Sequence, residues 1–177
     1  MLCAISRIEF DQIYSRLDIK LEEVGESFYN PLLRPLVDEL VGKGIAVESD
    51  GAICIFVPKQ KVPLIIQKSD GGFNYDTTDV AALRYRIEEL KVDRAVYVTD
   101  LGQEFHFKQI FKAGELCKFY DPKVTRVDHM GFGLVLQESK EEVKEGEKKK
   151  LEKIKTRSGD SIKLMELLNE ATERALA

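Results

Sequence analysis

The sequence predicts an α/β fold in which helices flank a parallel sheet. Short apolar segments alternate with segments of helical periodicity, and strands separated by helices of this length are typical of βαβ crossovers. Polar or glycine-rich segments follow three of the predicted strands, where sheets of this kind bind ligands. With 177 residues, 44% hydrophobic and 33% charged, the chain has the composition of a folded globular domain.

The first predicted elements are a helix and a hairpin. Apolar residues recur at helical spacing over residues 32–41, and the pattern stops at Gly42 and Gly44. Pro35 is expected in the first turn of this helix, where its missing N–H costs little. Residues 45–57 predict a β-hairpin because a Ser-Asp-Gly turn at 49–51 separates two apolar runs.

Alternating strands and helices are predicted for the remainder. Residues 63–67 form a short buried strand, and the apolar positions of residues 80–90 mark a second helix. Thr77 or Thr78 is the expected N-cap of that helix, with Asp79 in its first turn. Further elements are expected as a strand at 94–99, a helix at 103–119, a strand region at 125–136 and a final helix at 161–175.

Charge and cysteine usage exclude several classes of protein. Lysine and arginine total 27 against 31 acidic residues, so the net charge of −4 shows no bulk preference for nucleic acid or an anionic membrane. No apolar run is long enough to span a bilayer and no secretory signal opens the chain, which predicts a cytoplasmic protein without a membrane partner. Cys3, Cys54 and Cys117 are widely spaced, so buried or idle thiols are expected, and two histidines exclude a multi-histidine metal site.

Residues 138–153 differ in composition from the rest of the chain. Six acidic and six basic residues occur among its sixteen positions, and its few apolar residues cannot form a buried face. The pattern predicts an exposed charged insertion, either a linker or a charged helix. RNA contact from Lys148, Lys149 and Lys150 is the alternative, although the interleaved acids cancel most of their field.

Candidate site residues lie just after the predicted strands. Tyr75 and Asp79 are four residues apart at a helix start, so a phenol and a carboxylate can point together into a cleft; Asp79 as an ordinary capping acid is the alternative. Gln103 and His106 are three apart and share a helix face, which also suits a plain surface pair. Residues 155–161, KTRSGDS, form either a phosphate-binding loop or an ordinary basic loop before a helix.

Six segments in this order resemble the arginyl-tRNA synthetase family of class I aminoacyl-tRNA synthetases. They are CAISRIEFDQIYSRLDI, VGESFYNP, IIQKSDGGFNYDTTDVAALRYR, DRAVYVTDLGQEFHFKQIF, DPKVTRVDHMGFGLVL and KIKTRSGDSIKLMELL. The resemblance implies a Rossmann-like catalytic domain that activates L-arginine with ATP to arginyl-adenylate and transfers it to tRNA(Arg). ATP enters as a substrate with Mg²⁺, and no tightly bound cofactor or resident metal is expected.

The resemblance also implies roles for individual residues. The arginine pocket falls on Glu26, Tyr75, Asp79 and Gln103, and two carboxylates suit a guanidinium because it is a permanently charged planar fork. Lys155 and Arg157 are implied as catalytic residues that stabilise the phosphates electrostatically. The implied ATP-binding residues are His106, His129, Phe132, Gly133, Lys155, Thr156, Arg157 and Ser158.

Two departures from the family pattern shape the expectation for the isolated chain. No HIGH-type segment is present, and Thr156 and Arg157 stand where the general class I loop has Ser-Lys. We therefore expect a central piece of the enzyme, with a connecting region at 1–62 and the second half of the Rossmann-type domain at 63–177, inactive by itself. The alternatives are a stand-alone arginine-binding module without catalysis, and a piece that only folds and associates with a complementary half.

Overall fold

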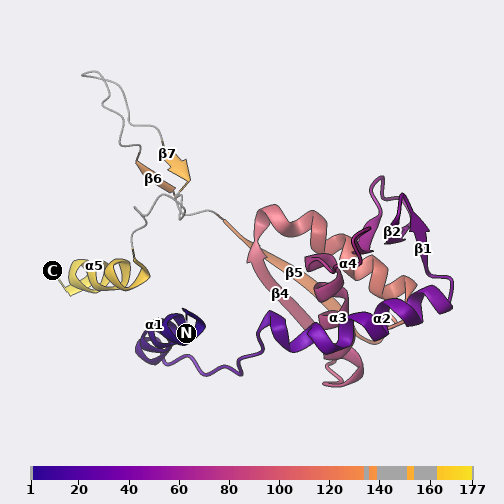
Figure 1. The fold of residues 1–177 in the computed structure, drawn as a ribbon. Coiled ribbons are helices and arrows are strands. Elements are labelled where there is room, and N and C mark those ends of the chain that lie inside the picture. The colour runs from indigo at the N-terminus through magenta and orange to yellow at the C-terminus, as the bar shows by residue number, and fades with distance from the viewer. Residues whose placement is uncertain (1, 134–135, 139–150, 154–162, 177) are drawn as a thin grey trace, which may run out of the picture. The chain divides into compact units, whose positions relative to one another are not determined.

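The computed structural model describes residues 2–133, 136–138, 151–153 and 163–176. The chain forms two compact units (Figure 1). One comprises Met1–Glu23 with Leu134–Ala177, and the other is the continuous segment Val24–Gly133. All the predicted site residues that the structure describes belong to the second unit.

The elements of the Val24–Gly133 unit form two small sheets and three α-helices. They are η1 (Glu26–Tyr29), α2 (Asn30–Gly42), β1 (Ala46–Ser49), β2 (Ala52–Ile55), β3 (Leu64–Gln67), α3 (Tyr75–Glu88), β4 (Arg94–Asp100), η2 (Leu101–Gln103), α4 (Glu104–Leu116) and β5 (Arg126–Phe132).

The predicted βαβ unit is confirmed by β4, α4 and β5. The two strands pair in parallel from Arg94 opposite Arg126 to Asp100 opposite Phe132, and α4 provides the crossover. The buried side chains of Phe107, Ile110 and Ala113 attach α4 to the core. The carboxyl ends of both strands therefore lie at the same edge, as the α/β fold class requires.

The first sheet has the antiparallel order β1-β2-β3. The predicted hairpin is confirmed, and its turn places Asp50 at φ 52° and Gly51 at φ 76°, the left-handed conformation that two-residue hairpin turns need. The expectation that residues 63–67 belong to the parallel sheet was wrong. Strand β3 instead pairs antiparallel with β2, because the chain folds back after the hairpin.

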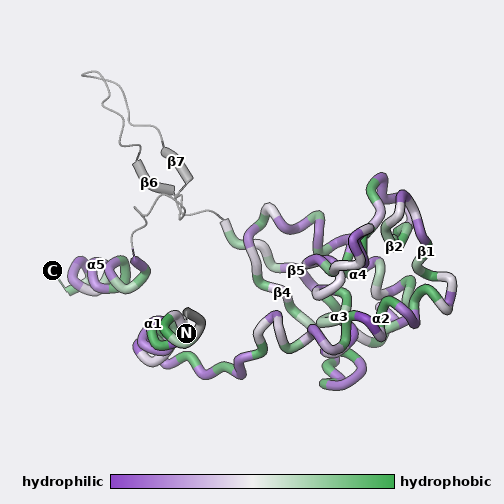
Figure 2. Tube along the Cα trace, in the orientation of Figure 1, coloured by the Kyte–Doolittle hydropathy of each residue, from purple (hydrophilic) through white to green (hydrophobic). Residues whose placement is uncertain are grey.

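Helix α2 begins earlier than its apolar pattern indicated. Asn30 opens the helix and Pro31 occupies the first turn, so Pro35 lies inside the helix, and its expected place in the first turn was wrong. The apolar pattern starts only at Leu32, which moved the predicted start toward the C-terminus. The predicted end is confirmed, since α2 stops at Gly42 and Gly44 follows with φ 67°. Hydrophobic and hydrophilic residues alternate along α2 in Figure 2, as expected of an amphipathic helix.

Arg84 connects the two helices α2 and α3. Its guanidinium donates to Glu39 Oε2 on α2 and to Glu88 Oε2 on its own helix, each at 2.7 Å. The guanidinium carbon also lies 5.5 Å from the ring centroid of Phe119. Because Arg84 is only partly exposed, these contacts are screened less than those of a surface pair. Hydrogen bonds from Lys43 and then Arg84 lower the pKa of Glu39.

The other unit contains α1 (Leu2–Arg16), β6 (Leu136–Glu138), β7 (Leu151–Lys153) and α5 (Leu164–Leu176). Arg16 joins the two helices through contacts with Met165, Asn169 and Thr172. The periodicity of the sequence did not predict α1, because its apolar residues do not gather on one face. Strands β6 and β7 pair antiparallel at the two ends of the charged segment, and residues 139–150 lie outside the described part of the chain.

Two further sequence expectations concern cysteines and membranes. Cys54 and Cys117 are free and buried, which confirms the expected idle thiols at these two positions. Burial raises the pKa of Cys117 to about 12, so this thiol is unreactive at neutral pH. Across the described ranges, none of the helices has both the length and the apolar character needed to cross a bilayer.

Candidate functional site

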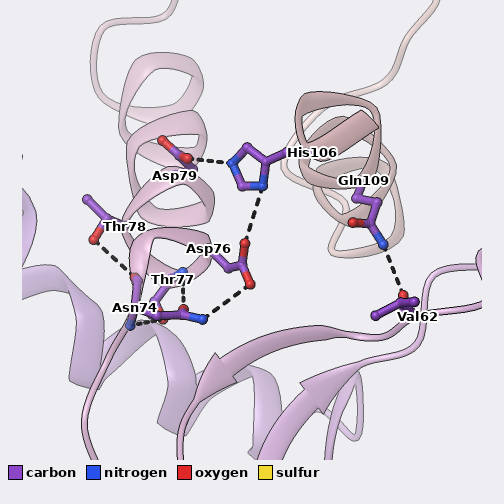
Figure 3. Close-up of polar contacts among 8 residues, drawn as sticks. All are labelled: Val62, Asn74, Asp76, Thr77, Thr78, Asp79, His106 and Gln109. Atoms are coloured by element: carbon purple, nitrogen blue, oxygen red, sulfur yellow. Dashed lines mark hydrogen bonds and ion pairs between the residues drawn. The ribbon is translucent and has the colours of Figure 1, made fainter. Parts of the chain in front are cut away.

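The N-terminus of α3 is fixed by a capping box centred on Asn74. The Asn74 side chain accepts from the backbone N–H of Thr77 at 3.3 Å, and the Thr77 hydroxyl accepts from the Asn74 N–H at 3.4 Å (Figure 3). The prediction of Thr77 or Thr78 as N-cap was therefore wrong. Thr77 is fully buried, and its hydroxyl also donates to the carbonyl of Ile66 at 2.7 Å. This hydrogen bond ties the helix to β3.

The earlier start of α3 changes the position of its acidic residues. Asp76 lies in the first turn, so Asp79 lies in the second, and its expected place in the first turn was wrong. Asp76 and Asp79 are three residues apart and share one helix face. Asp79 is thus not explained by capping, and both carboxylates are directed toward α4 (Figure 3).

His106 on α4 lies between these two carboxylates. Its Nε2 is 2.6 Å from Asp79 Oδ2 and its Nδ1 is 3.3 Å from Asp76 Oδ1. The three side chains are mostly shielded, with exposed fractions of 18% for His106, 13% for Asp76 and 30% for Asp79. Burial by itself lowers the pKa of His106, but hydrogen bonds and charges from Asp76 and Asp79 outweigh it and raise the pKa to about 9. His106 is therefore a cation at neutral pH.

Aromatic rings extend this cluster toward β5. The Tyr75 ring, 64% exposed, lies edge-on to His106 with centroids 5.1 Å apart. On the other side, Phe107 packs 5.0 Å from His106 and stacks on His129 at 5.3 Å. His129 Nε2 contacts the Thr99 hydroxyl at 2.8 Å, at the carboxyl end of β4.

A hollow of about 500 Å³ opens beside Asp79 along β4. Its volume falls in the range of small-ligand sites, about 300–1,000 Å³. Arg86 lies on its wall, with the guanidinium carbon 4.8 Å from the ring centroid of the buried Tyr97. A larger hollow of about 790 Å³ lies in the unit that contains α1, and none of the predicted site residues that the structure describes lines it.

The structure brings some of the predicted site residues together and leaves others apart. Tyr75, Asp79 and His106 meet at the α3–α4 contact. Glu26, in the first turn of η1, and Gln103, the last residue of η2, are exposed. Within the described ranges, neither forms a hydrogen bond or ion pair with Asp79.

Two of the predicted nucleotide-binding residues, Phe132 and Gly133, lie at the end of β5, while His129 lies within this strand and His106 on α4. Phe132 is exposed opposite Asp100, and Gly133 directly follows the strand. Gly131 packs so closely on η2 that an added Cβ would lie 2.6 Å from Leu101 Cδ1 and 3.0 Å from Leu101 Cα. Lys155, Thr156, Arg157 and Ser158 lie outside the described residues.

Asp76 is the site residue that sequence reasoning missed. The D-x-x-D spacing of Asp76 and Asp79 was visible in the sequence and places both on one helix face. Their common partner was not visible, because His106 lies 27 residues from Asp79 and was grouped with Gln103 on its own helix. In the part of the chain that the structure describes, no group of histidine, cysteine and acidic residues is arranged to hold a metal ion.

The parallel βαβ unit, with a charged cluster and a hollow beside its strand, belongs to the α/β fold class, in which ligands bind at the carboxyl ends of the strands. The family is defined by comparison with known proteins. All of residues 1–177 match the family model described as "tRNA synthetases class I (R), catalytic domain". The chain belongs to this family.

Individual relatives agree with this assignment. The chain is 48% identical to "Arginine--tRNA ligase, cytoplasmic" of Gallus gallus, covering 99% of this chain and 25% of that protein. It is also 48% identical to "Arginine--tRNA ligase" of Synechococcus sp., covering 99% of this chain and 29% of the relative. Over 98% of its length it matches a crystal structure of arginyl-tRNA synthetase from Plasmodium falciparum, with a TM-score of 0.78, 41% identity and 26% of that chain covered. The chain thus spans about a quarter of the length of these relatives.

Proposed function

We propose that this chain forms part of an arginine–tRNA ligase, which activates L-arginine with ATP and Mg²⁺ and transfers it to tRNA(Arg). The observation that carries the proposal is the half-buried carboxylate of Asp79 beside a hollow of about 500 Å³, in a chain of this family. A carboxylate shielded from water binds a guanidinium more strongly than an exposed one, because the ion pair is less screened.

The substrate's guanidinium is assigned to Asp79 and Tyr75. Asp79 supplies the negative charge, and Tyr75 supplies a hydroxyl or an aromatic face beside it. Glu26 and Gln103 are proposed to complete the pocket when arginine is bound, with Gln103 at the amino-acid end. Because a neutral side chain would leave the Asp79 charge unpaired, this pocket disfavours uncharged amino acids.

The nucleotide is assigned to the end of β5 and the loop at 155–158. His129, Phe132 and Gly133 are proposed to face adenine, while Lys155 and Arg157, with Thr156 and Ser158, stabilise the phosphates in the activation step. His106 was placed with this group by resemblance. Its contact with Asp79 favours instead a position on the arginine side.

A second candidate function is arginine binding without catalysis. The cluster and its hollow both belong to the single unit Val24–Gly133, which suits a binding module. Calorimetric titration of the 177-residue chain with arginine and with lysine separates the two functions. Arginine-selective binding that Asp79→Ala abolishes supports the module, and absence of heat supports the ligase part.

The domain division at residue 62 and the location in the cell are also proposals. Residues 1–62 are proposed as a connecting region and residues 63–177 as the second half of the catalytic domain. Several relatives carry the word "cytoplasmic" in their names, which supports a cytoplasmic location.

The ligase proposal is tested by ATP–pyrophosphate exchange with the complete polypeptide that carries this chain, in the presence of tRNA(Arg). We expect exchange with arginine and none above background with lysine. Exchange that is equal with both amino acids, or absent with arginine, would contradict the proposal. The 177-residue chain assayed alone is expected to show no exchange.

A further inference from the structure

The two carboxylates around His106 use their oxygens differently. Both oxygens of Asp76 are engaged, Oδ1 with His106 Nδ1 and Oδ2 with Asn74 Nδ2 at 3.2 Å. Asp79 uses only Oδ2, and its Oδ1 has no hydrogen-bond partner among the described residues. Figure 3 shows this second oxygen on the side of Asp79 that faces away from the imidazole. Both carboxylate oxygens of Asp76 are therefore held in place, while Asp79 keeps one oxygen that can accept a hydrogen bond from another molecule.

Both contacts of His106 require the imidazolium form. An ionised carboxylate only accepts hydrogen bonds, and a neutral imidazole has a single N–H. Two carboxylates facing the two ring nitrogens can both be satisfied only when both nitrogens carry a proton. Two negative carboxylates and one positive ring leave one net negative charge on these three side chains, and Arg86 is a further cation that lines the hollow beside Asp79.

We propose that His106 is a positioning residue for arginine recognition, held by Asp76 so that it fixes Asp79 with one oxygen directed toward the substrate's guanidinium. This inference rests on the proposed function and adds to it a residue that does not touch the substrate. Asn74 completes the arrangement because its side chain caps α3 and also donates to Asp76. Asn74 therefore holds Asp76, Asp76 holds His106, and His106 holds Asp79.

Other ionisable groups act on this cluster from two elements. Tyr75 on α3 lies edge-on to the His106 ring. Arg86 on α3 interacts with Asp79 through its charge, whereas burial, with a smaller contribution from Asp79, raises the pKa of Tyr97 on β4 and keeps it neutral; both residues line the same hollow. None of these three residues forms a hydrogen bond with a ring nitrogen of His106. The protonation state of His106 is therefore determined by Asp76 and Asp79.

Two substitutions at His106 separate positioning from general support of the fold. His106→Gln can place an amide N–H near the former Nε2 and so retain the bond to Asp79. His106→Asn can place an amide N–H only near the former Nδ1 and so retain the bond to Asp76. Both variants are neutral and similar in size, so a merely structural role predicts equal effects from them.

The first measurement is the Michaelis constant in the exchange assay of the complete polypeptide. For His106→Asn we expect the constant for arginine to rise about tenfold or more, as for loss of a hydrogen bond to a charged group. For His106→Gln we expect a smaller rise, and for both variants an unchanged constant for ATP. Equal effects of the two variants, or tighter arginine binding in either, would overturn the proposal, the latter because it would make the imidazolium a competitor of the substrate.

The second measurement is independent of arginine. Nitrogen-15 NMR of the 177-residue chain near pH 7 should show both nitrogens of His106 protonated, and Asp76→Asn should lower the pH at which this ring titrates. A neutral ring at this pH would overturn the positioning role even if the enzyme uses arginine. If NMR shows the imidazolium but the wild-type polypeptide shows no arginine-dependent exchange, the proposed function fails and the role toward a substrate fails with it.

Discussion

The two halves of the candidate site are built differently. The proposed arginine side, at the contact of α3 and α4, consists of charged side chains that are mostly shielded and in contact with one another. The proposed nucleotide side, in its described part along β5, shows a contact between His129 and Thr99 and then the exposed Phe132 and Gly133. Among the described residues, side-chain charge therefore characterises the first region, whereas the second is a strand end with few polar side chains.

Phe107 joins the two regions, and its removal should have the largest effect. Its buried ring packs on both His106 and His129. Phe107→Ala leaves a cavity there, and we expect a loss of about 3–5 kcal/mol in the free energy of unfolding, measured by urea denaturation. Phe105→Ala is the control, because Phe105 is 54% exposed, and its effect should stay within about 0.5 kcal/mol. Similar losses from the two variants would show that the two regions do not depend on this ring.

Two glycines test the nucleotide side separately. Gly131 allows η2 to approach β5, and the Cβ of Gly131→Ala would press on the backbone and side chain of Leu101. We expect a loss of about 1–3 kcal/mol in the free energy of unfolding. An added Cβ at Gly133 meets nothing within 4 Å, so Gly133→Ala is the matched control. A Gly131→Ala variant as stable as Gly133→Ala would mean that the close approach is unimportant.

The pH dependence of stability tests the arginine side. The pKa of His106 is about 9 in the folded chain against an ordinary value of 6.5, so the folded state binds the proton more tightly. The resulting stabilisation is complete below pH 6.5 and is lost as the pH rises through about 9. After allowance for solvent screening we expect it to amount to about 1–2 kcal/mol.

The measurement compares thermal or urea unfolding of the wild-type chain and His106→Gln between pH 6 and 9.5. The difference between the two curves isolates His106 from other groups that titrate in this range. Stability differences that do not change with pH would contradict the imidazolium between Asp76 and Asp79.

Sequence patterns predicted the fold better than the site. Apolar periodicity located α2, the β1–β2 hairpin and the β4-α4-β5 unit, because these elements bury one continuous face. It placed β3 in the wrong sheet, since a short buried strand carries no mark of its partner. It placed the start of α3 too late because Thr77, a good capping residue by type, is used to hold β3.

Predicting the site residues would have required knowledge of contacts between segments that are distant in the sequence. Tyr75 and Asp79 were found from their spacing, but spacing on α3 could not reveal that His106 of α4 pairs with both Asp76 and Asp79. Such a pairing depends on how two helices pack, which no local pattern encodes. Resemblance supplied the remaining residues, and Glu26 and Gln103 stay predictions.

The central claim is that Asp79 recognises the guanidinium of arginine and leaves ATP binding to the other region. The most direct measurement compares Asp79→Asn with the wild-type complete polypeptide in steady-state exchange, and uses Asp38→Asn, an exposed carboxylate on α2, as the control. We expect Asp79→Asn to raise the Michaelis constant for arginine by about tenfold to a hundredfold, as for loss of a charged hydrogen-bond partner, with the constant for ATP nearly unchanged. Arginine kinetics as in the wild type, or equal rises for arginine and ATP, would contradict the claim.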